Sequence, residues 1–319
     1  MSDTSEQPAA PASPMAEPRT RLEKLDAFMA ANPWHPRVVP YFVFIVGLAI
    51  TGFVPGGDRV AAMAYLPLYL LINVIILWLL WRYRKLTPEL NLKFHWTVIP
   101  SAVLLTAAWV ALGFAWNLLF TGNVYIDEYH DTAGVVPSVP PVDATPFGEL
   151  YLVAPALFWV TFICRGIGMS VTVALFEELF VRSALLRGFH QWKETKLGLM
   201  QVAADMPAVG DMVATKPKFI AAQKQPAAFT KQLTETKLGA VTLFATCAST
   251  LIFMLAHLPR DWAGCIACGF VWCWMVWYTN RASLPEAKRK GLGPVIWSHG
   301  LVNAGLWVYT ITTGDWQFL

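Results

Sequence analysis

The sequence predicts an all-α protein, a polytopic transmembrane helical bundle of seven to eight helices. Of its 319 residues, 56% are hydrophobic and only 14% are charged, and the chain contains 15 tryptophans. This composition is typical of membrane proteins and unusual for a large soluble domain. The apolar residues form long unbroken runs. Such runs favour spanning helices over a transmembrane barrel, whose strands would show short alternating segments.

Eight apolar segments follow one another along the chain, and the longest reach the ~17 to 25 residues with which a helix crosses a bilayer core. They are 38–54, 60–81, 96–120, 147–164, 166–189, 238–257, 264–279 and 294–313. The short connections after 81 and after 280 are rich in Lys and Arg, which places both in the cytoplasm. This orientation leaves one net crossing for 147–189, which is long enough for two. A break at 165–168 is therefore expected to separate a crossing helix from an interfacial or re-entrant piece.

The polar regions divide the chain into three parts. Residues 1–20 are rich in Pro, Ala, Ser and Glu and are expected to be a disordered tail. Residues 21–146 hold the leading transmembrane helices, with a short surface helix at 21–32 and an acidic extracytoplasmic loop at 121–146. Residues 147–313 form the second membrane domain, interrupted by a long Lys-containing loop at 192–237. We expect that loop to be solvated, with substrate access or binding to an anionic lipid surface as alternative roles.

Two adjacent acids, Glu177 and Glu178, stand in the otherwise apolar run LFEELFVRSALLRGFHQW. Carboxylates at membrane depth are costly and normally face the bundle interior, find partners and mark function. Glu178 precedes Arg182 by four residues, which suits a salt bridge on one helix face. Glu177 points about 100° away and is available for another task. The alternative is that both acids solvate a helix end at the interface, beside basic side chains that reach toward water.

Two histidines also lie within apolar segments. His257 ends an uncharged segment one turn after Phe253, and His299 precedes Asn303 by four residues. A lone histidine in such a place is more often a hydrogen-bonded core residue, but three such segments together predict one polar cavity. A carboxylate and a neutral imidazole can share the removal of a proton from water, while a second imidazole and an amide can stabilise an oxyanion. This set suffices to hydrolyse an amide without a covalent intermediate.

Three spaced motifs occur in a fixed order on these segments. They are EExxxR (Glu177, Glu178, Arg182), FxxxH (Phe253, His257) and HxxxN (His299, Asn303). Together they resemble the CAAX-prenyl-protease and bacteriocin-processing family of intramembrane glutamic endopeptidases, and the resemblance covers residues 147–309. The run PWHPRVVPYFVFI is similar to family members that accompany bacterial exosortase sorting systems. The expected location is therefore the bacterial plasma membrane, with the lipid bilayer and sorting-system proteins as partners.

The resemblance implies a role for each motif residue. Glu177 is expected to be the general base on a water, assisted by His257. His299 and Asn303 would form the oxyanion site, while Glu178 and Arg182 would be the supporting pair that fixes the helix. Ser183 departs from the family pattern, which often has glycine there, and is expected to lie outside the reacting groups. The substrate would be a membrane-anchored protein or peptide, and no cofactor is expected.

Several alternatives remain open at this stage. Two glutamates and two histidines can also ligate zinc, as in a zinc-dependent membrane protease, although the sequence lacks HExxH and Asn is a poor zinc ligand. A non-catalytic scaffold, or an immunity or assembly factor, could use the same cavity for binding. A transporter could use Glu177 or Glu178 as a proton relay. The basic residues form no stripe, so nucleic-acid binding is not expected.

Overall fold

The structure is a computed structural model that describes residues 20–51, 58–120, 150–151, 154–226, 229–315 and 318. Helices account for all of the regular secondary structure in these ranges, as the sequence predicts. The predicted acidic loop at 121–146 and all but the last residue of the predicted disordered tail lie outside the described residues.

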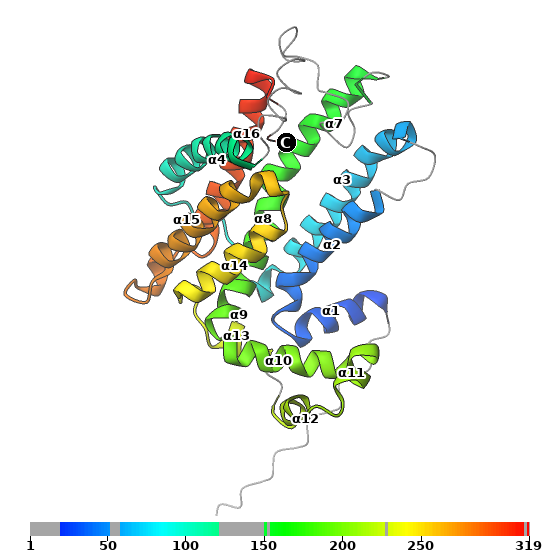
Figure 1. The fold of residues 1–319 in the computed structure, drawn as a ribbon, viewed down its shortest axis with the longest axis vertical. Coiled ribbons are helices and arrows are strands. Elements are labelled where there is room, and N and C mark those ends of the chain that lie inside the picture. Colours follow the sequence, from blue (N-terminus) through cyan, green and yellow to red (C-terminus); the bar gives the residue numbers. More distant parts are fainter. Residues whose placement is uncertain are drawn as a thin grey trace, which may run out of the picture.

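Seven helices form the frame of the molecule around one long central helix (Figure 1). They are α1 (Arg21–Ala31), α2 (His35–Thr51), α3 (Asp58–Arg82), α4 (Val98–Phe120), α14 (Leu243–Leu255), α15 (Trp262–Asn280) and α16 (Gly293–Thr313). Short 3₁₀ turns stand between them: η1 (Arg84–Leu86), η5 (Pro259–Asp261) and η6 (Glu286–Lys288). A capping box between Thr20 and Glu23 starts α1, which confirms the predicted helix at 21–32. Its place on the membrane surface stays a prediction.

The central helix runs without a break from Pro155 to His190, 36 residues in all. It comprises α7 (Pro155–Gly168), the π-helical segment η3 (Met169–Val173), α8 (Ala174–Glu178), the π-helical segment η4 (Leu179–Leu185) and α9 (Leu186–His190). The predicted break at 165–168 is therefore wrong. Gly166 and Gly168 make room for the rings of Trp307 and Tyr69 without interrupting the helix. The region that was expected to hold two segments thus contains one continuous candidate span, in agreement with the single net crossing that the charge rule leaves for it.

The described residues include four helices that are long and apolar enough to cross a membrane: 63–82, 98–116, 155–190 and 259–280. The number rises to five if α1 and α2, which are bent by 118° to each other, form one broken span. The predicted count of seven to eight helices is not confirmed. The predicted segment 238–257 is one reason for the difference, because its helix α14 has 13 residues. The hydroxyl of Thr242 caps that helix and fixes its late start.

Residues 192–237 form four helices, so the prediction of a loop is wrong for this region. The helices are α10 (Trp192–Asp205), α11 (Pro207–Val213), α12 (Pro217–Gln223) and α13 (Lys231–Thr234). Proline at the first position starts α11 and α12, where its missing N–H costs nothing. These helices lie together at one end of the molecule, next to α1 and α9 (Figure 1).

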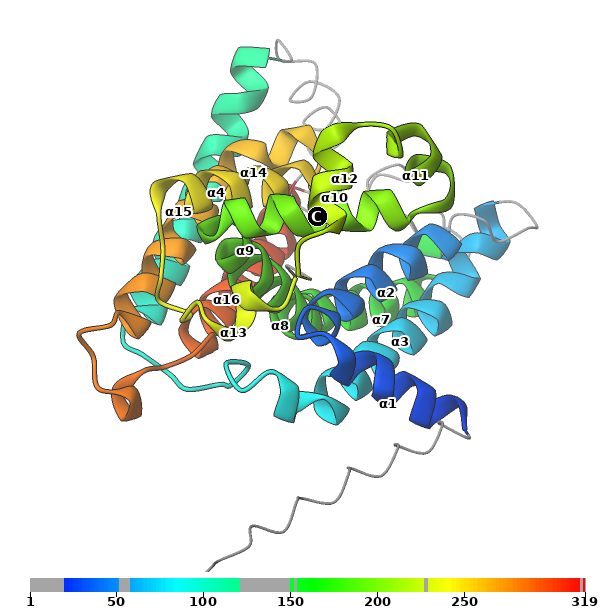
Figure 2. The same ribbon diagram turned by 90° about the horizontal axis from the view of Figure 1, so that it is seen from below.

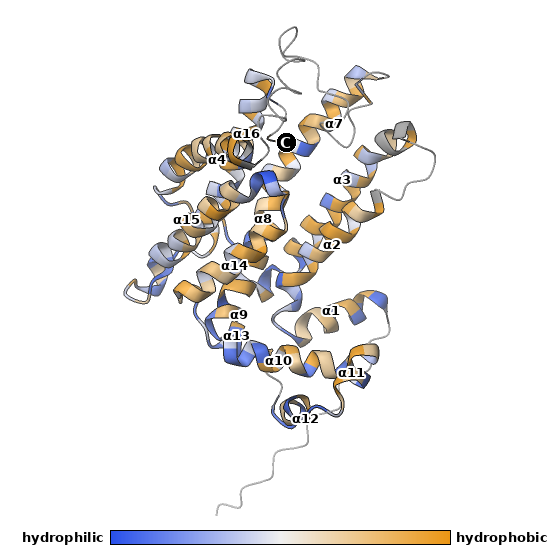
Figure 3. Ribbon diagram, viewed as in Figure 1, coloured by the Kyte–Doolittle hydropathy of each residue, from blue (hydrophilic) through white to orange (hydrophobic). Residues whose placement is uncertain are grey.

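The outward faces of the long helices are apolar. Exposed side chains on three of these helices include Phe42 and Val46 on α2, Leu71 and Val74 on α3, and Val103 and Leu104 on α4. Figure 3 shows hydrophobic residues along these helices and hydrophilic ones around α13 and after α15. So large an apolar surface would promote aggregation in water and suits contact with lipid.

The interior of the bundle brings α8 and α16 together (Figure 2). Helices α2 and α3 lie on one side of this pair, and α4 and α15 lie on the other. The approach depends on Gly300 of α16, because a Cβ atom at this position would stand 2.3 Å from the carbonyl oxygen of Ser170 in η3. Small residues of this kind allow close helix packing in membranes. The contact sets the two motif residues of α16 opposite the glutamates of α8.

Candidate active site

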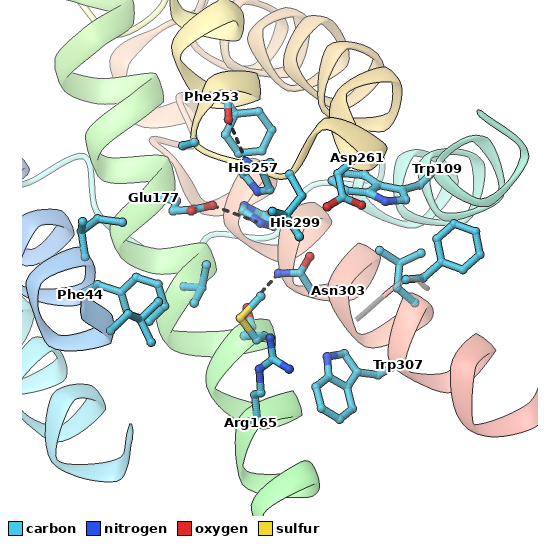
Figure 4. A pocket seen from close by; sticks show the side chains of 18 of the residues that line it. Phe44, Trp109, Arg165, Glu177, Phe253, His257, Asp261, His299, Asn303 and Trp307 are labelled. Carbon is cyan, nitrogen blue, oxygen red and sulfur yellow. Dashed lines mark hydrogen bonds and ion pairs between the residues drawn. The ribbon is translucent and has the colours of Figure 1, made fainter. Parts of the chain in front are cut away.

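One cavity of about 360 Å³ lies where α8, α14 and α16 meet (Figure 4). Four of the six predicted site residues line it: Glu177, His257, His299 and Asn303. They come from three segments that are far apart in the sequence. The other two, Glu178 and Arg182, do not line the cavity and are fully buried behind its wall.

Glu178 has a polar partner on each carboxylate oxygen. Its Oε1 lies 2.9 Å from Nδ1 of His299, and its Oε2 lies 3.4 Å from Nε of Arg182. The guanidinium of Arg182 also stands over two aromatic rings, 4.7 Å from the centre of Phe253 and 5.2 Å from that of Trp272. Buried charges are tolerated only when they are paired, and cation–π contacts add to the pairing. The predicted salt bridge between Glu178 and Arg182 is present in this form.

His299 joins the two glutamates. An ionised carboxylate can only accept a hydrogen bond, so Nδ1 of His299 donates to Glu178. Its Nε2 then faces Glu177, whose Oε2 is 3.7 Å away, a separation longer than a hydrogen bond. The imidazole is stacked on Trp272 at 4.5 Å between ring centres. The indole N–H of Trp272 donates to Ser298, so this ring is itself fixed.

His257 stands just after the last turn of α14. Its Nδ1 donates to the carbonyl oxygen of Phe253 at 2.8 Å, and its own carbonyl accepts the indole N–H of Trp262 at 3.1 Å. In a neutral imidazole bonded in this way, the lone pair is on Nε2. Figure 4 shows His257 beside His299 and Glu177 at the same cavity.

Asn303 connects α16 to the π-helical part of the central helix. Its side-chain N–H donates to the carbonyl oxygen of Met169 at 2.9 Å. Met169 begins η3, where the main-chain pairing changes from α to π. Such changes occur often at functional sites, and they present carbonyl groups to side chains. The amide keeps a second hydrogen and its oxygen for a ligand.

Residues 225–305 match the family model described as Type II CAAX prenyl endopeptidase Rce1-like. The matched range contains the FxxxH and HxxxN motifs. The matched range is about a quarter of the chain and supports a relation to the CAAX protease family. No curated protein and no solved structure matches the chain. The apolar candidate spans and this match together indicate an integral membrane protein.

Several residues that line the candidate active-site cavity could not be identified from the sequence. Arg165, Arg260 and Asp261 also line it. Arg165 was interpreted only as an interruption, and the other two follow His257 closely at what looked like a span boundary. One wall comes from α2, through Tyr41, Phe44, Ile45 and Leu48. Their spacing places them on one helix face, but nearly every residue of α2 is apolar, so the spacing alone carried no signal.

Glu89 is a further buried acid that the sequence did not single out. Both of its carboxylate oxygens accept from Arg37, at 2.7 and 3.0 Å, and it also accepts from Arg187 at 2.6 Å and from the hydroxyl of Ser183. Burial by itself would raise the pKa of Glu89. The charges of Arg187 and Arg37, with hydrogen bonds from Arg37 and Ser183, outweigh burial and lower the pKa to about 2. Ser183 therefore joins a structural network away from the cavity.

The described residues contain no group of three or more His, Cys, Asp or Glu side chains arranged to hold a metal ion.

Proposed function

We propose that the chain is an intramembrane endopeptidase that hydrolyses a peptide bond of a membrane-associated substrate, with Glu177 as general base. The observation that carries this proposal is the meeting of Glu177, His257, His299 and Asn303 at one cavity. The family match supports a protease of the CAAX type and is independent of that geometry. The glutamic mechanism, the residue roles and the bacterial plasma membrane location belong to the proposal.

The first step is activation of water between Glu177 and His257. A water oxygen within hydrogen-bond reach of the Glu177 carboxylate loses its proton to it, and the lone pair on Nε2 of His257 accepts a second hydrogen bond from the same water. The oxygen then bonds to the carbonyl carbon of the substrate. The proton on Glu177 passes to the leaving nitrogen as the C–N bond breaks. The products are a new carboxylic acid and a new amine, and transfer of the acid's proton to the amine gives the carboxylate and the ammonium.

The second requirement is stabilisation of the oxyanion that forms on the substrate carbonyl. Nε2 of His299 and the amide of Asn303 are the candidate donors, both at the cavity. Because Nδ1 of His299 donates to Glu178, donation from Nε2 to the oxyanion requires a hydrogen on both ring nitrogens. Glu178 contributes by fixing the orientation of the His299 ring, which makes it a positioning residue.

The substrate class follows from the walls of the cavity. The four α2 side chains that line it are apolar or aromatic, whereas the opposite side carries the polar motif residues. An extended peptide with an apolar segment fits between these two walls. We therefore propose a membrane-anchored protein or peptide as substrate, including proteins of a bacterial sorting system.

The first prediction tests the base. Glu177→Gln removes the proton acceptor and should abolish the appearance of specific new termini in membrane proteomes with labelled native termini. Glu235→Gln, the same change at an exposed glutamate, is the matched control and should leave every terminus in place. Unchanged termini in the Glu177→Gln cells, at equal protein abundance, would reject the protease proposal and favour a scaffold or assembly factor.

Two further measurements separate the remaining alternatives. A zinc-dependent protease would lose cleavage in the purified wild-type protein after treatment with a chelator and regain it with zinc. The proposed mechanism predicts no effect of the chelator. A transporter would show a proton flux in vesicles that Glu177→Gln or Glu178→Gln stops, without any change in termini.

A further inference from the structure

A second cavity, of about 400 Å³, lies at the far end of α15 from the candidate active site. Its walls come from the connection before α4 and from the connection between α15 and α16, and they include His95, Tyr278, Arg281, Lys288 and Lys290. The two connections are joined: the main-chain N–H of Leu292 donates to the carbonyl of Glu89 at 2.9 Å. In Figure 1 the connection after α15 is the orange loop at the lower left.

The lining of this cavity is strongly basic. Three cationic side chains, Arg281, Lys288 and Lys290, contribute to it, and no carboxylate does. Arg281 and Lys290 are partly buried, whereas Lys288 is exposed. Burial, together with the charge of Lys290, lowers the pKa of His95, so this ring stays neutral at pH 7 and its nitrogens can bind polar groups. Concentrated positive charge in a partly shielded hollow attracts an anion.

The basic side chains are held in place before any ligand arrives. Asn280 closes the connection through two hydrogen bonds with the backbone of Gly291, at 2.9 and 2.8 Å. Gly291 has φ +63°, which favours glycine. The guanidinium of Arg281 lies over the ring of Tyr278, 4.7 Å from its centre, and donates to the Tyr278 carbonyl at 3.0 Å. A site that is organised in advance loses less entropy on binding.

The surroundings of the cavity place it at the depth of lipid headgroups. The candidate span 259–280 ends at its edge. Large exposed aromatic side chains stand on the same elements, namely Phe94, Trp96, Trp274 and Trp297. Trp297 is anchored by a hydrogen bond from its indole N–H to the carbonyl of Leu92 at 3.1 Å. Exposed tryptophans mark the interface between membrane and water, and basic pockets between helices at this level suit anionic headgroups.

We propose that this interfacial basic pocket, formed by His95, Arg281, Lys288 and Lys290, binds a phosphate group supplied by the headgroup of an anionic phospholipid. The phosphate oxygens accept hydrogen bonds from the three cations, and the acyl chains extend along the exposed aromatic residues. The site is separate from the cavity that contains Glu177, so the inference does not depend on the proposed protease activity.

The test uses the full-length protein in nanodiscs of phosphatidylcholine with a minor fraction of phosphatidylglycerol, and native mass spectrometry counts the phosphatidylglycerol that stays bound. Lys288→Gln combined with Lys290→Gln should weaken retention by roughly tenfold or more, given the contribution of each surface lysine to anionic lipid binding. Lys216→Gln with Lys218→Gln is the matched control, because it removes two exposed lysines of the same spacing at the start of α12. Lys288→Arg with Lys290→Arg should restore retention.

Three outcomes decide the inference. Selective loss in the Lys288 and Lys290 double variant, with an unchanged unfolding temperature, supports the site. Equal loss in the Lys216 and Lys218 control overturns it, because binding then follows net charge alone. Inorganic phosphate is added in a separate arm at increasing concentration. Displacement of phosphatidylglycerol by inorganic phosphate only at high ionic strength supports a lipid headgroup as the ligand. Tight binding of inorganic phosphate in nanodiscs of phosphatidylcholine alone would mean that the ligand is free phosphate, and the lipid proposal would fail.

Discussion

At the scale of single residues, the two adjacent glutamates differ in what surrounds their carboxylates. Glu177 reaches the cavity, and its nearest ionisable neighbour, Nε2 of His299, is 3.7 Å away. Glu178 is fully buried and contacts both His299 and Arg182. The first arrangement leaves a carboxylate able to meet a substrate, while the second fixes the imidazole that faces it. In the proposed mechanism, the pair therefore divides into a reacting group, Glu177, and a supporting one, Glu178.

This difference predicts unequal effects of the two substitutions on the free energy of unfolding. Glu178→Gln leaves Arg182 buried without a counter-charge, which should lower the free energy of unfolding by about 3 to 5 kcal/mol. Glu177→Gln should change it by less than about 1 kcal/mol, because no buried cation depends on that carboxylate alone. Thermal unfolding of both variants in the same detergent measures the difference. Equal destabilisation by the two substitutions would contradict the division of roles.

Asn303 allows a test of the proposed oxyanion site. Asn303→Ala removes an amide donor at the cavity and should lower the rate of cleavage roughly 100-fold, the effect of losing one oxyanion donor. Asn73→Ala is a suitable control, because Asn73 also donates to a main-chain carbonyl, that of Tyr69, yet lies outside the cavity. Cleavage assays on the two purified variants decide the point, and equal loss of activity would count against the proposed role.

At the scale of helices, the site depends on how closely α16 approaches η3. Gly300 faces the Ser170 carbonyl at a distance that leaves no room for a side chain, and its neighbours His299 and Asn303 face the cavity from the same stretch. Tight packing of this kind transmits even small displacements, because a packed interior yields little. The geometry of the site is thus set by a helix contact as much as by the motif residues themselves.

Gly300→Ala should push α16 away from η3. We expect a loss of about 1 to 3 kcal/mol in unfolding free energy, typical of an added methyl group in a packed interior, together with reduced cleavage. Val308→Leu enlarges a lipid-facing side chain of the same helix and should change neither property. Unfolding and cleavage measured in parallel test this. If the Gly300→Ala protein had the unfolding free energy and cleavage rate of the wild type, the site would not depend on the close contact between α16 and η3.

Much of the helical frame could be predicted from the sequence, and the exceptions have physical causes. Segments such as 60–81 and 294–313 were recognisable because long apolar runs leave the chain few alternatives to a helix. The continuous helix through 165–168 was not recognisable, because the two glycines there pack against rings that are distant in the sequence, Tyr69 at 99 residues before Gly168 and Trp307 at 141 residues after Gly166. The helices within 192–237 have mixed composition, which gives no strong periodic signal.

The candidate site follows the same pattern. Spacing within a helix pointed to the pair Glu178 and Arg182, and the structure contains it. Trp272, which stacks on His299, and Glu89, which binds Arg37 and Arg187, depend on partners 27 to 98 residues away. Contacts of that length arise from tertiary packing, so local patterns do not reveal them.

At the scale of the whole molecule, Glu89 links parts that are distant in the sequence. Its carboxylate binds Arg37 of α2 and Arg187 of α9, and its carbonyl accepts from Leu292 before α16. The leading helices are therefore joined to both segments that hold motif residues. A network of satisfied buried charges specifies one arrangement of these elements and excludes looser ones.

The low pKa of Glu89 predicts how stability depends on pH. The fall from 4.5 to about 2 corresponds to about 3 kcal/mol of unfolding free energy. Because the pKa is lowered on folding, this contribution is complete above about pH 4.5 and is lost as the pH falls toward 2. The free energies of unfolding of the wild type and of Glu89→Gln should thus differ most at pH 7, and at pH 3 the difference should be about half as large. The control Glu235→Gln should have nearly the same free energy of unfolding as the wild type at both pH values. A difference between Glu89→Gln and the wild type that does not change with pH would contradict the prediction.

Helix α14 has 13 residues and, at 1.5 Å per residue, a length of about 20 Å, whereas a bilayer core is about 30 Å thick. If one end of α14 lies at one surface of the bilayer core, its other end lies roughly 10 Å short of the opposite surface. The irregular backbone that follows, including His257, is tolerated at such depth only beside protein or water. For the proposed mechanism, the shortness of this helix predicts a hydrated path through the nonpolar layer, along which the water of each cleavage would reach Glu177 without crossing lipid.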